Sequence, residues 1–163
     1  MKQQSILNRL AKFAFLIVLG LGLAGHLHAQ AQNLEKSGRA LQGYDPVAFF
    51  TKGKPVKGNP AISSKFNGAT YYFGSAEDKV LFDKDPAKYV PQFGGFCAYG
   101  VSKGDLVKIE VDAFQIVDGR LLLQYDKGIR EKFNKDTKGN LKTADANWPT
   151  VSKKKPSTGW FGG

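Results

Sequence analysis

The first 31 residues of this 163-residue chain differ from the rest and decide which part of it can fold. Lys2, Arg9 and Lys12 make the start positive, and residues 13–25 are all apolar or glycine. Spanning a bilayer takes about 20 apolar residues, so this run is short for a transmembrane helix. A basic start, a short apolar run and a small-residue exit are typical of a secretory signal peptide.

Two cleavage points fit this leader. The Ala-Gln-Ala pattern of residues 29–31 predicts cleavage after Ala31, with cleavage after Ala29 as the alternative. A further alternative is that the leader stays attached as an uncleaved anchor. We therefore expect residues 1–31 to be a signal peptide and the protein to be exported, either periplasmic or secreted.

Removal of the leader changes which chemistry the chain can perform. It takes away His26, His28 and the only methionine, and it leaves Cys97 as the one cysteine. Without histidine, Ser-His-Asp and Cys-His catalysis are excluded, because no other side chain ordinarily titrates near neutrality. Zinc sites of four Cys or His ligands, blue-copper sites and haem held by His or Met are excluded too. We expect a protein that is not an enzyme, and its cofactor is unknown. The alternative is an enzyme that uses Cys97 as its nucleophile, with the thiol pKa lowered by a nearby lysine.

The charge of the exported part favours a solvated surface over nucleic-acid binding. It has 21 basic and 14 acidic residues, and 18 of the basic residues are scattered lysines. Arginine is the side chain that bidentate phosphate recognition prefers, and export separates the protein from nucleic acid. We expect at most a weak, salt-sensitive contact between Lys153–Lys155 and an anionic membrane surface.

The pattern of the exported part predicts a small single α+β domain with two β-hairpins and three or four short helices. Asn-Gly and Asp-Gly pairs accept the positive φ angles of type I′ turns. The expected hairpins are 62–66 with 70–73, around Asn67-Gly68, and 114–117 with 120–125, around Asp118-Gly119.

Cap residues mark the expected helices. Ser75 begins one whose apolar side is formed by residues 80–82, and Asp85-Pro86 begins a second. Asp126 begins a third that runs through Phe133. A fourth is expected over 141–148, before Pro149, and 47–50 is expected to be a short buried strand.

Several separated motifs resemble the YHS domain family, in its small exported branch. They are Tyr44-Asp45-Pro46-Val47, residues 66–73, Asp85-Pro86-Ala87-Lys88-Tyr89, residues 94–100, residues 117–123 and residues 144–149. The resemblance implies a YHS-like domain at 44–149, and the composition predicts a polar lead-in at 32–43 and a flexible basic tail at 150–163. The YHS module resembles treble-clef metal-binding domains, but its suspected metal-binding members carry cysteines where this chain has Ala48 and Gly74. The resemblance therefore does not carry a metal over to this chain.

The candidate ligand-binding residues are Tyr44, Asp45, Tyr72, Cys97 and Tyr99, which we expect around an aromatic pocket. Cys97 is the only candidate metal ligand. The alternatives are that Cys97 is inert in the core or pairs with another chain, that Asp45 only stabilises a turn, and that the tyrosines are half-buried core.

The function expected from these residues is that of an exported, non-catalytic YHS-type module. It would bind a small ligand or metal ion in an aromatic pocket near Asp45 and Cys97. The alternative is an envelope interaction or scaffold protein with no small-molecule site, whose protein partner is unknown.

Overall fold

Two β-hairpins form the framework of the protein. The computed structural model describes residues 30–157. Strand β1 (Asn59–Phe66) pairs with β2 (Ala69–Phe73), and β3 (Glu110–Val117) pairs with β4 (Arg120–Gln124), each pair antiparallel and in its own sheet. Both central residues of each turn have positive φ, as a type I′ turn requires. The α+β class and the two hairpins are confirmed.

The two hairpins share one register at an offset of 51 residues. Asn59 pairs with Phe73 as Glu110 pairs with Gln124, and all later pairs correspond in the same way. Each first strand has a register shift after its opening pair. The two hairpins are therefore copies of one backbone pattern, including its irregularity.

A capped helix follows each hairpin at the same distance. Ser75 begins α3 (Ala76–Lys84), and Asp126 begins α6 (Lys127–Asn134). Each cap side chain accepts a hydrogen bond from the backbone N–H three residues ahead, at 3.1 Å and 2.7 Å. This bond satisfies one of the N–H groups that a helix start leaves unpaired. Both predicted caps are confirmed.

A second helix follows each of these, again from matching residues. Asp85 and Asp136 have nearly identical backbone angles, φ −150° with ψ 74° and φ −149° with ψ 72°. They precede α4 (Pro86–Tyr89) and α7 (Thr137–Val151). We call residues 59–89 the N-terminal unit and residues 110–151 the C-terminal unit.

Helix α7 is longer than expected at both ends, so the prediction of a helix over 141–148 that stops at Pro149 is wrong. The Asp136 side chain caps the helix earlier, before its apolar positions begin. Pro149 removes one backbone hydrogen bond near the C-terminal end. The helix continues because α7 packs against α5, and Ser152 still donates its N–H to the carbonyl of Trp148 at 2.9 Å.

Helix α2 (Ala48–Thr51) replaces the buried strand that we expected at 47–50. The Asp45 carboxylate accepts hydrogen bonds from the N–H groups of Val47 and Ala48, at 2.8 Å and 3.3 Å. An apolar run alone does not distinguish a buried strand from a buried helix. Here the hydrogen bonds from Val47 and Ala48 to the Asp45 carboxylate favour the helix.

The segment between the two units has an unusual backbone, as its glycines predict. In η2 (Gln92–Gly95), Phe93, Gly94 and Gly95 all have positive φ. Helix α5 (Ala98–Ser102), which we did not expect, follows directly. Six α-helices, α2 to α7, therefore lie within the described residues.

Helix α3 buries less apolar surface than expected. Phe82 is 1% exposed, but Val80 is 66% exposed and Leu81 is 41% exposed. Successive helical residues point about 100° apart, so three in a row do not share one buried face. The prediction that 80–82 form the apolar side is wrong for the first two.

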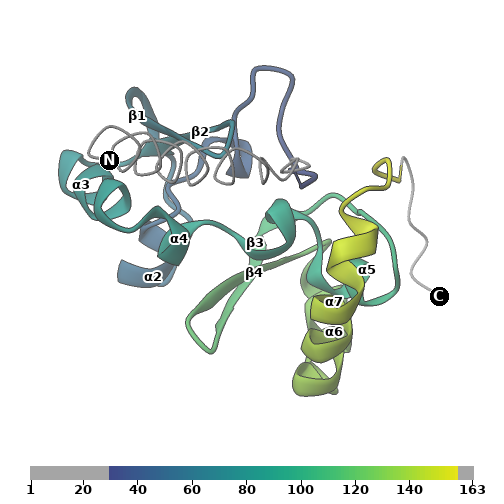
Figure 1. Cartoon of the computed structure of the whole chain (residues 1–163). Coiled ribbons are helices and arrows are strands. Elements are labelled where there is room, and N and C mark those ends of the chain that lie inside the picture. The colour runs from purple at the N-terminus through teal and green to yellow at the C-terminus, as the bar shows by residue number, and fades with distance from the viewer. Residues whose placement is uncertain (1–29, 158–163) are drawn as a thin grey trace, which may run out of the picture.

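Figure 1 shows β1, β2, α3 and α4 at one side of the molecule, α5, α6 and α7 at the other, and β3 and β4 between them. One cluster of buried side chains joins both hairpins, with Phe73 and Leu123 among its members. A second cluster joins β4, α5, α6 and α7, with Phe133 at 0% exposure. The hairpins thus share one core with α3, and a second core lies among β4, α5, α6 and α7.

The expected lead-in packs against the domain. Ala40 and Leu41, the latter in η1 (Leu41–Gly43), are each 4% exposed. The N–H of Ala31 donates to the carbonyl of Ser152 at 3.1 Å, so residues before and after the two units meet. Residues 1–29, which hold most of the expected signal peptide, and residues 158–163 lie outside the described residues. Across 30–157, no helix combines the length and apolarity needed to cross a membrane.

Candidate functional site

Asp45, a predicted ligand-binding residue, is fully buried. Besides its bonds to α2, it accepts a hydrogen bond from the N–H of Gly74 at 2.7 Å. The carboxylate thus joins α2 to the end of β2. Ala48 and Gly74, where suspected metal-binding YHS members carry cysteines, are both bonded to it.

Asp45 belongs to a small charged network with Asp78 and Lys52. Burial raises the pKa of Asp45, and hydrogen bonds from Gly74 and Val47 lower it less. Burial also opposes ionisation of Asp78, but hydrogen bonds, first that from Lys52 at 3.0 Å, hold its pKa below the ordinary value. The network ties α2 to α3 and offers no surface of Asp45 to a ligand.

Cys97 is also fully buried. Its Sγ donates to Gln124 Oε1 at 3.3 Å and accepts from the N–H of Gly100 at 3.4 Å. The same Gln124 oxygen accepts from the N–H of Tyr99 at 3.0 Å. Burial raises the pKa of the Cys97 thiol, so little thiolate is present at neutral pH. The position agrees with the alternative of a core cysteine that caps α5.

The predicted tyrosines lie against different cations. Lys57 lies over the ring of Tyr44 at 4.4 Å, Arg39 over Tyr72 at 5.8 Å, and Lys103 over Tyr99 at 4.8 Å. The structure therefore groups Cys97 with Tyr99 through Gln124, and joins neither to the Asp45 network by a hydrogen bond of these side chains. Among residues 30–157, no three His, Cys, Asp or Glu side chains are grouped to hold a metal ion.

A different place combines open space with suitable side chains. A cavity of about 700 Å³ lies where the β1–β2 turn, η2, the start of β4 and α7 meet. We call it the inter-hairpin cavity. Four aromatic rings line it: Phe66, Tyr71, Phe93 and Trp148. Its size lies in the range of small-molecule sites.

The aromatic wall is held in place by its own contacts. The rings of Phe93 and Trp148 meet edge to face, with centroids 5.8 Å apart. Phe93 has φ 53° and ψ 39°, a left-handed conformation that is costly for a residue with a Cβ atom. Burial raises the pKa of Tyr71 to about 12, so its hydroxyl stays protonated.

An ion pair at the cavity is equally fixed. Arg120 donates from both terminal nitrogens to the carboxylate of Asp145, at 2.9 Å and 2.6 Å. Its Nε donates to Gln92 Oε1 at 3.1 Å, and the guanidinium lies 5.6 Å from the centroid of Phe93. Bidentate pairing of this kind fixes geometry as well as charge. The Asp145 carboxylate raises the pKa of Arg120.

Amide side chains complete the lining. They belong to Gln30, Gln32, Asn67 and Gln92, and the predicted cleavage after Ala31 leaves the last three in the exported chain. The Gln32 side chain donates to the carbonyl of Asn67 at 2.5 Å, so the segment before the N-terminal unit forms one wall. A Cβ atom at Gly94 would collide with the carbonyl oxygen of Ala31, so glycine allows that wall to approach η2.

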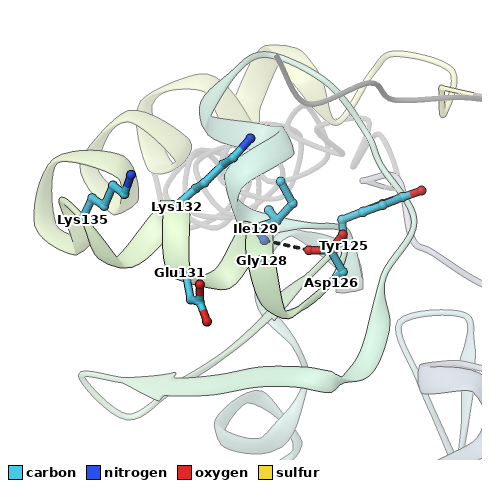
Figure 2. Close-up of a pocket in the computed structure, with 7 residues that line it drawn as sticks. All are labelled: Tyr125, Asp126, Gly128, Ile129, Glu131, Lys132 and Lys135. Atoms are coloured by element: carbon cyan, nitrogen blue, oxygen red, sulfur yellow. Dashed lines mark hydrogen bonds between the residues drawn. The ribbon is translucent and has the colours of Figure 1, made fainter.

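A second cavity, of about 490 Å³, lies beside the start of α6. Figure 2 shows its lining side chains, with Asp126 bonded to the helix and Glu131, Lys132 and Lys135 directed apart from one another. The charged groups do not converge on one point. This cavity is therefore the weaker candidate.

The inter-hairpin cavity was missed by sequence reasoning. Its residues come from five separated segments, and the motifs that hold some of them, such as 66–73 and 144–149, do not indicate that these segments meet. The Gly94-Gly95 pair beside aromatic residues indicated an unusual backbone at this place but not a site.

No protein-family model, curated protein or solved structure significantly matches the chain. The resemblance to the YHS family therefore stays a prediction from the motifs.

Proposed function

We propose that this chain is an exported, non-catalytic YHS-type module that binds a small organic molecule in the inter-hairpin cavity. The observation that carries the proposal is a cavity of about 700 Å³ with four aromatic rings and a fixed ion pair. Small-molecule sites typically combine apolar walls with a few well-placed polar groups. The location differs from the expected pocket near Asp45 and Cys97, because both of those side chains are fully buried.

The titratable side chains of the lining support a role in binding rather than in catalysis. Its titratable side chains are Tyr71, Arg120 and Asp145. Tyr71 has a pKa of about 12, and Arg120 is bound by Asp145 in a bidentate pair. A general acid or base works best with a pKa near the operating pH. Neither Tyr71 nor Arg120 meets that condition, and both carboxylate oxygens of Asp145 accept hydrogen bonds from Arg120.

Ligand binding can be tested by NMR on the exported chain with a chemically mixed fragment library. We expect binding fragments to shift amide signals of residues 92–94, 120 and 145–148. Trp148→Ala should weaken their binding at least tenfold, because it removes an aromatic wall of the site. Lys142→Ala, an exposed change on the same helix, should leave binding unchanged.

The proposal fails if no fragment shifts these signals, or if Trp148→Ala binds as well as the original chain while remaining folded. Circular dichroism and urea unfolding of both variants establish whether they are folded. Shifts confined to residues around Asp45 and Cys97 would instead favour the pocket expected from the sequence.

The second candidate function is an envelope scaffold. It is favoured by the exposed apolar pair Val80 and Leu81 on α3, since large apolar side chains exposed together can mark a partner site. Export and any weak contact of Lys153–Lys155 with anionic lipid apply to both candidates. An export assay with mass analysis of the mature N-terminus tests the leader and the choice between Ala29 and Ala31.

A further inference from the structure

The side chains of the inter-hairpin cavity restrict the charge of its ligand. Arg120 and Asp145 are its charged residues, and each neutralises the other through two hydrogen bonds. Arg120 also donates its Nε to Gln92, so three of its five N–H groups are engaged. An anionic ligand would have to displace Asp145, and a cationic ligand would have to displace Arg120. The lining therefore favours a ligand without net charge.

The amide groups argue against a purely apolar ligand. The side-chain oxygen of Gln92 accepts the hydrogen bond from Arg120, and its amide nitrogen is able to donate to a ligand. The side chains of Asn67 and Gln32 lie at the same cavity. Covering such groups with hydrocarbon removes their water without giving them a partner, which is unfavourable.

The aromatic rings add a second requirement. Phe66 and Trp148 are half-buried, and Trp148 is held edge to face against Phe93. Such rings bind ligands that have an apolar face, including faces made of C–H groups. The cavity therefore selects a molecule that is neutral, rich in hydrogen-bonding groups at its edges and apolar on its faces.

We infer that the ligand is a neutral carbohydrate. Sugar rings place hydroxyl groups around their edge, where carboxylate, guanidinium and amide groups bind them, and C–H groups on their faces, where aromatic rings pack. In this assignment Asp145 and Gln92 bind hydroxyl groups, and Trp148 packs against a ring face. The inference rests on the proposed function, since it names the ligand class for the same cavity.

The test uses an array of neutral, carboxylated, sulfated and amino-substituted oligosaccharides, followed by calorimetry on each saccharide that binds. We expect binding to neutral saccharides. Gln92→Leu should weaken their binding at least tenfold, because the leucine has no amide to offer. Lys142→Ala on the same protein is the matched control, and it should bind as the original chain does.

Asp145→Asn provides a second variant at an exposed position, where loss of the fold is not expected. It releases the Arg120 guanidinium from its carboxylate. We expect neutral saccharides to bind less well and carboxylated saccharides to bind better, because the cavity then carries a positive charge. A purely structural role of Asp145 would lower all binding alike.

The carbohydrate inference is wrong if only charged saccharides bind, or if Asp145→Asn leaves the preference between neutral and carboxylated saccharides unchanged. It is also wrong if the fragment experiment finds cavity ligands while no saccharide binds, and the proposed function then stands without it. If neither fragments nor saccharides bind at the cavity, the proposed function fails first.

Discussion

The N-terminal and C-terminal units use the same backbone for different cores. Each is a hairpin with a positive-φ turn, a capped helix and an aspartate-started second helix, in matching register. Phe73, at the end of β2, corresponds to Gln124, at the end of β4, and both are fully buried. Asp78 of α3 corresponds to Ile129 of α6. The comparison indicates that turns and caps specify the path of the chain, while buried side chains vary around it.

Few residues are identical between the units. In the hairpin and first helix of each, the shared residues are Gly68 with Gly119, Phe82 with Phe133, and Lys84 with Lys135, and Asp85 with Asp136 follows. The glycines serve the turns, the phenylalanines fill the core, and the aspartates start the second helices. Three of these four pairs thus have a structural reason that is visible in both units.

The largest expected effect comes from the matched phenylalanines. Phe82→Ala and Phe133→Ala should each lower the free energy of unfolding by about 3–5 kcal/mol, because each leaves a large cavity. Both side chains are at most 1% exposed. Urea unfolding measures the loss, with Phe→Leu at each position as the milder control. A loss below about 1 kcal/mol at one position would show that the units do not depend on this residue equally.

The caps should have a smaller and similar effect in both units. Ser75→Ala and Asp126→Ala should each cost about 1 kcal/mol, because each leaves a helix N–H without its partner. Ser75→Thr and Asp126→Asn keep an oxygen acceptor and serve as controls. Thermal unfolding followed by circular dichroism measures the difference. If only one of the two alanine variants lost stability, the two caps would not be equivalent.

The pH dependence of stability should differ between the two units, because the carboxylate of Asp78 in α3 has no counterpart at the corresponding position of α6, which is Ile129. Its folded-state pKa lies below that of the unfolded chain, about 3.9, so its stabilising effect is present above that pH and is lost as the pH falls below it. The pKa of Asp45 is raised, and its contribution has the opposite sign.

Asp78→Asn should therefore flatten the acid side of the stability curve, by about 0.5 kcal/mol, a size typical of a pair whose lysine is exposed. Ile129→Val, the change at the corresponding position, should leave the shape of the curve unchanged. Urea unfolding at a series of pH values provides the measurement. An unchanged acid slope in Asp78→Asn would contradict the assignment of the lowered pKa.

The smallest effect is expected on the helix surfaces. Val80 and Leu81 of α3 correspond to Glu131 and Lys132 of α6. The double variant Val80→Glu, Leu81→Lys copies the charged surface onto the apolar one, and it should change stability by less than about 0.5 kcal/mol. If this variant no longer bound a protein partner that the original chain binds, while ligand binding in the cavity was unchanged, the result would support the scaffold function.

Local features of the fold were predictable, and tertiary ones were not. The turns at Asn67-Gly68 and Asp118-Gly119 and the caps at Ser75 and Asp126 depend on neighbouring residues, and all of them hold. Helix α2 was missed because its apolar run is too short to show a helical period, and because Asp45, which accepts the N–H groups at its start, precedes the helix and is also bonded to Gly74. The correspondence between the units was missed because so few residues are shared.

The candidate site was less predictable than the fold. Asp45 and Cys97 attracted attention as reactive residue types, yet burial removes both from ligands. Arg120 and Asp145 lie in two of the quoted motifs, 117–123 and 144–149, but were not predicted to meet. Their pairing depends on how β4 and α7 pack, and no spacing along the chain records that contact.

The meeting of Ala31 with Ser152 has a consequence for protein engineering. Ala31 and Ser152, near the two ends of the described residues, are hydrogen-bonded to each other, so in a chain that keeps Ala31 a short peptide linker is enough to join these ends. New termini opened at the exposed loop around Gly53 would produce a circular permutant in which α2 is separated from the strand that follows it.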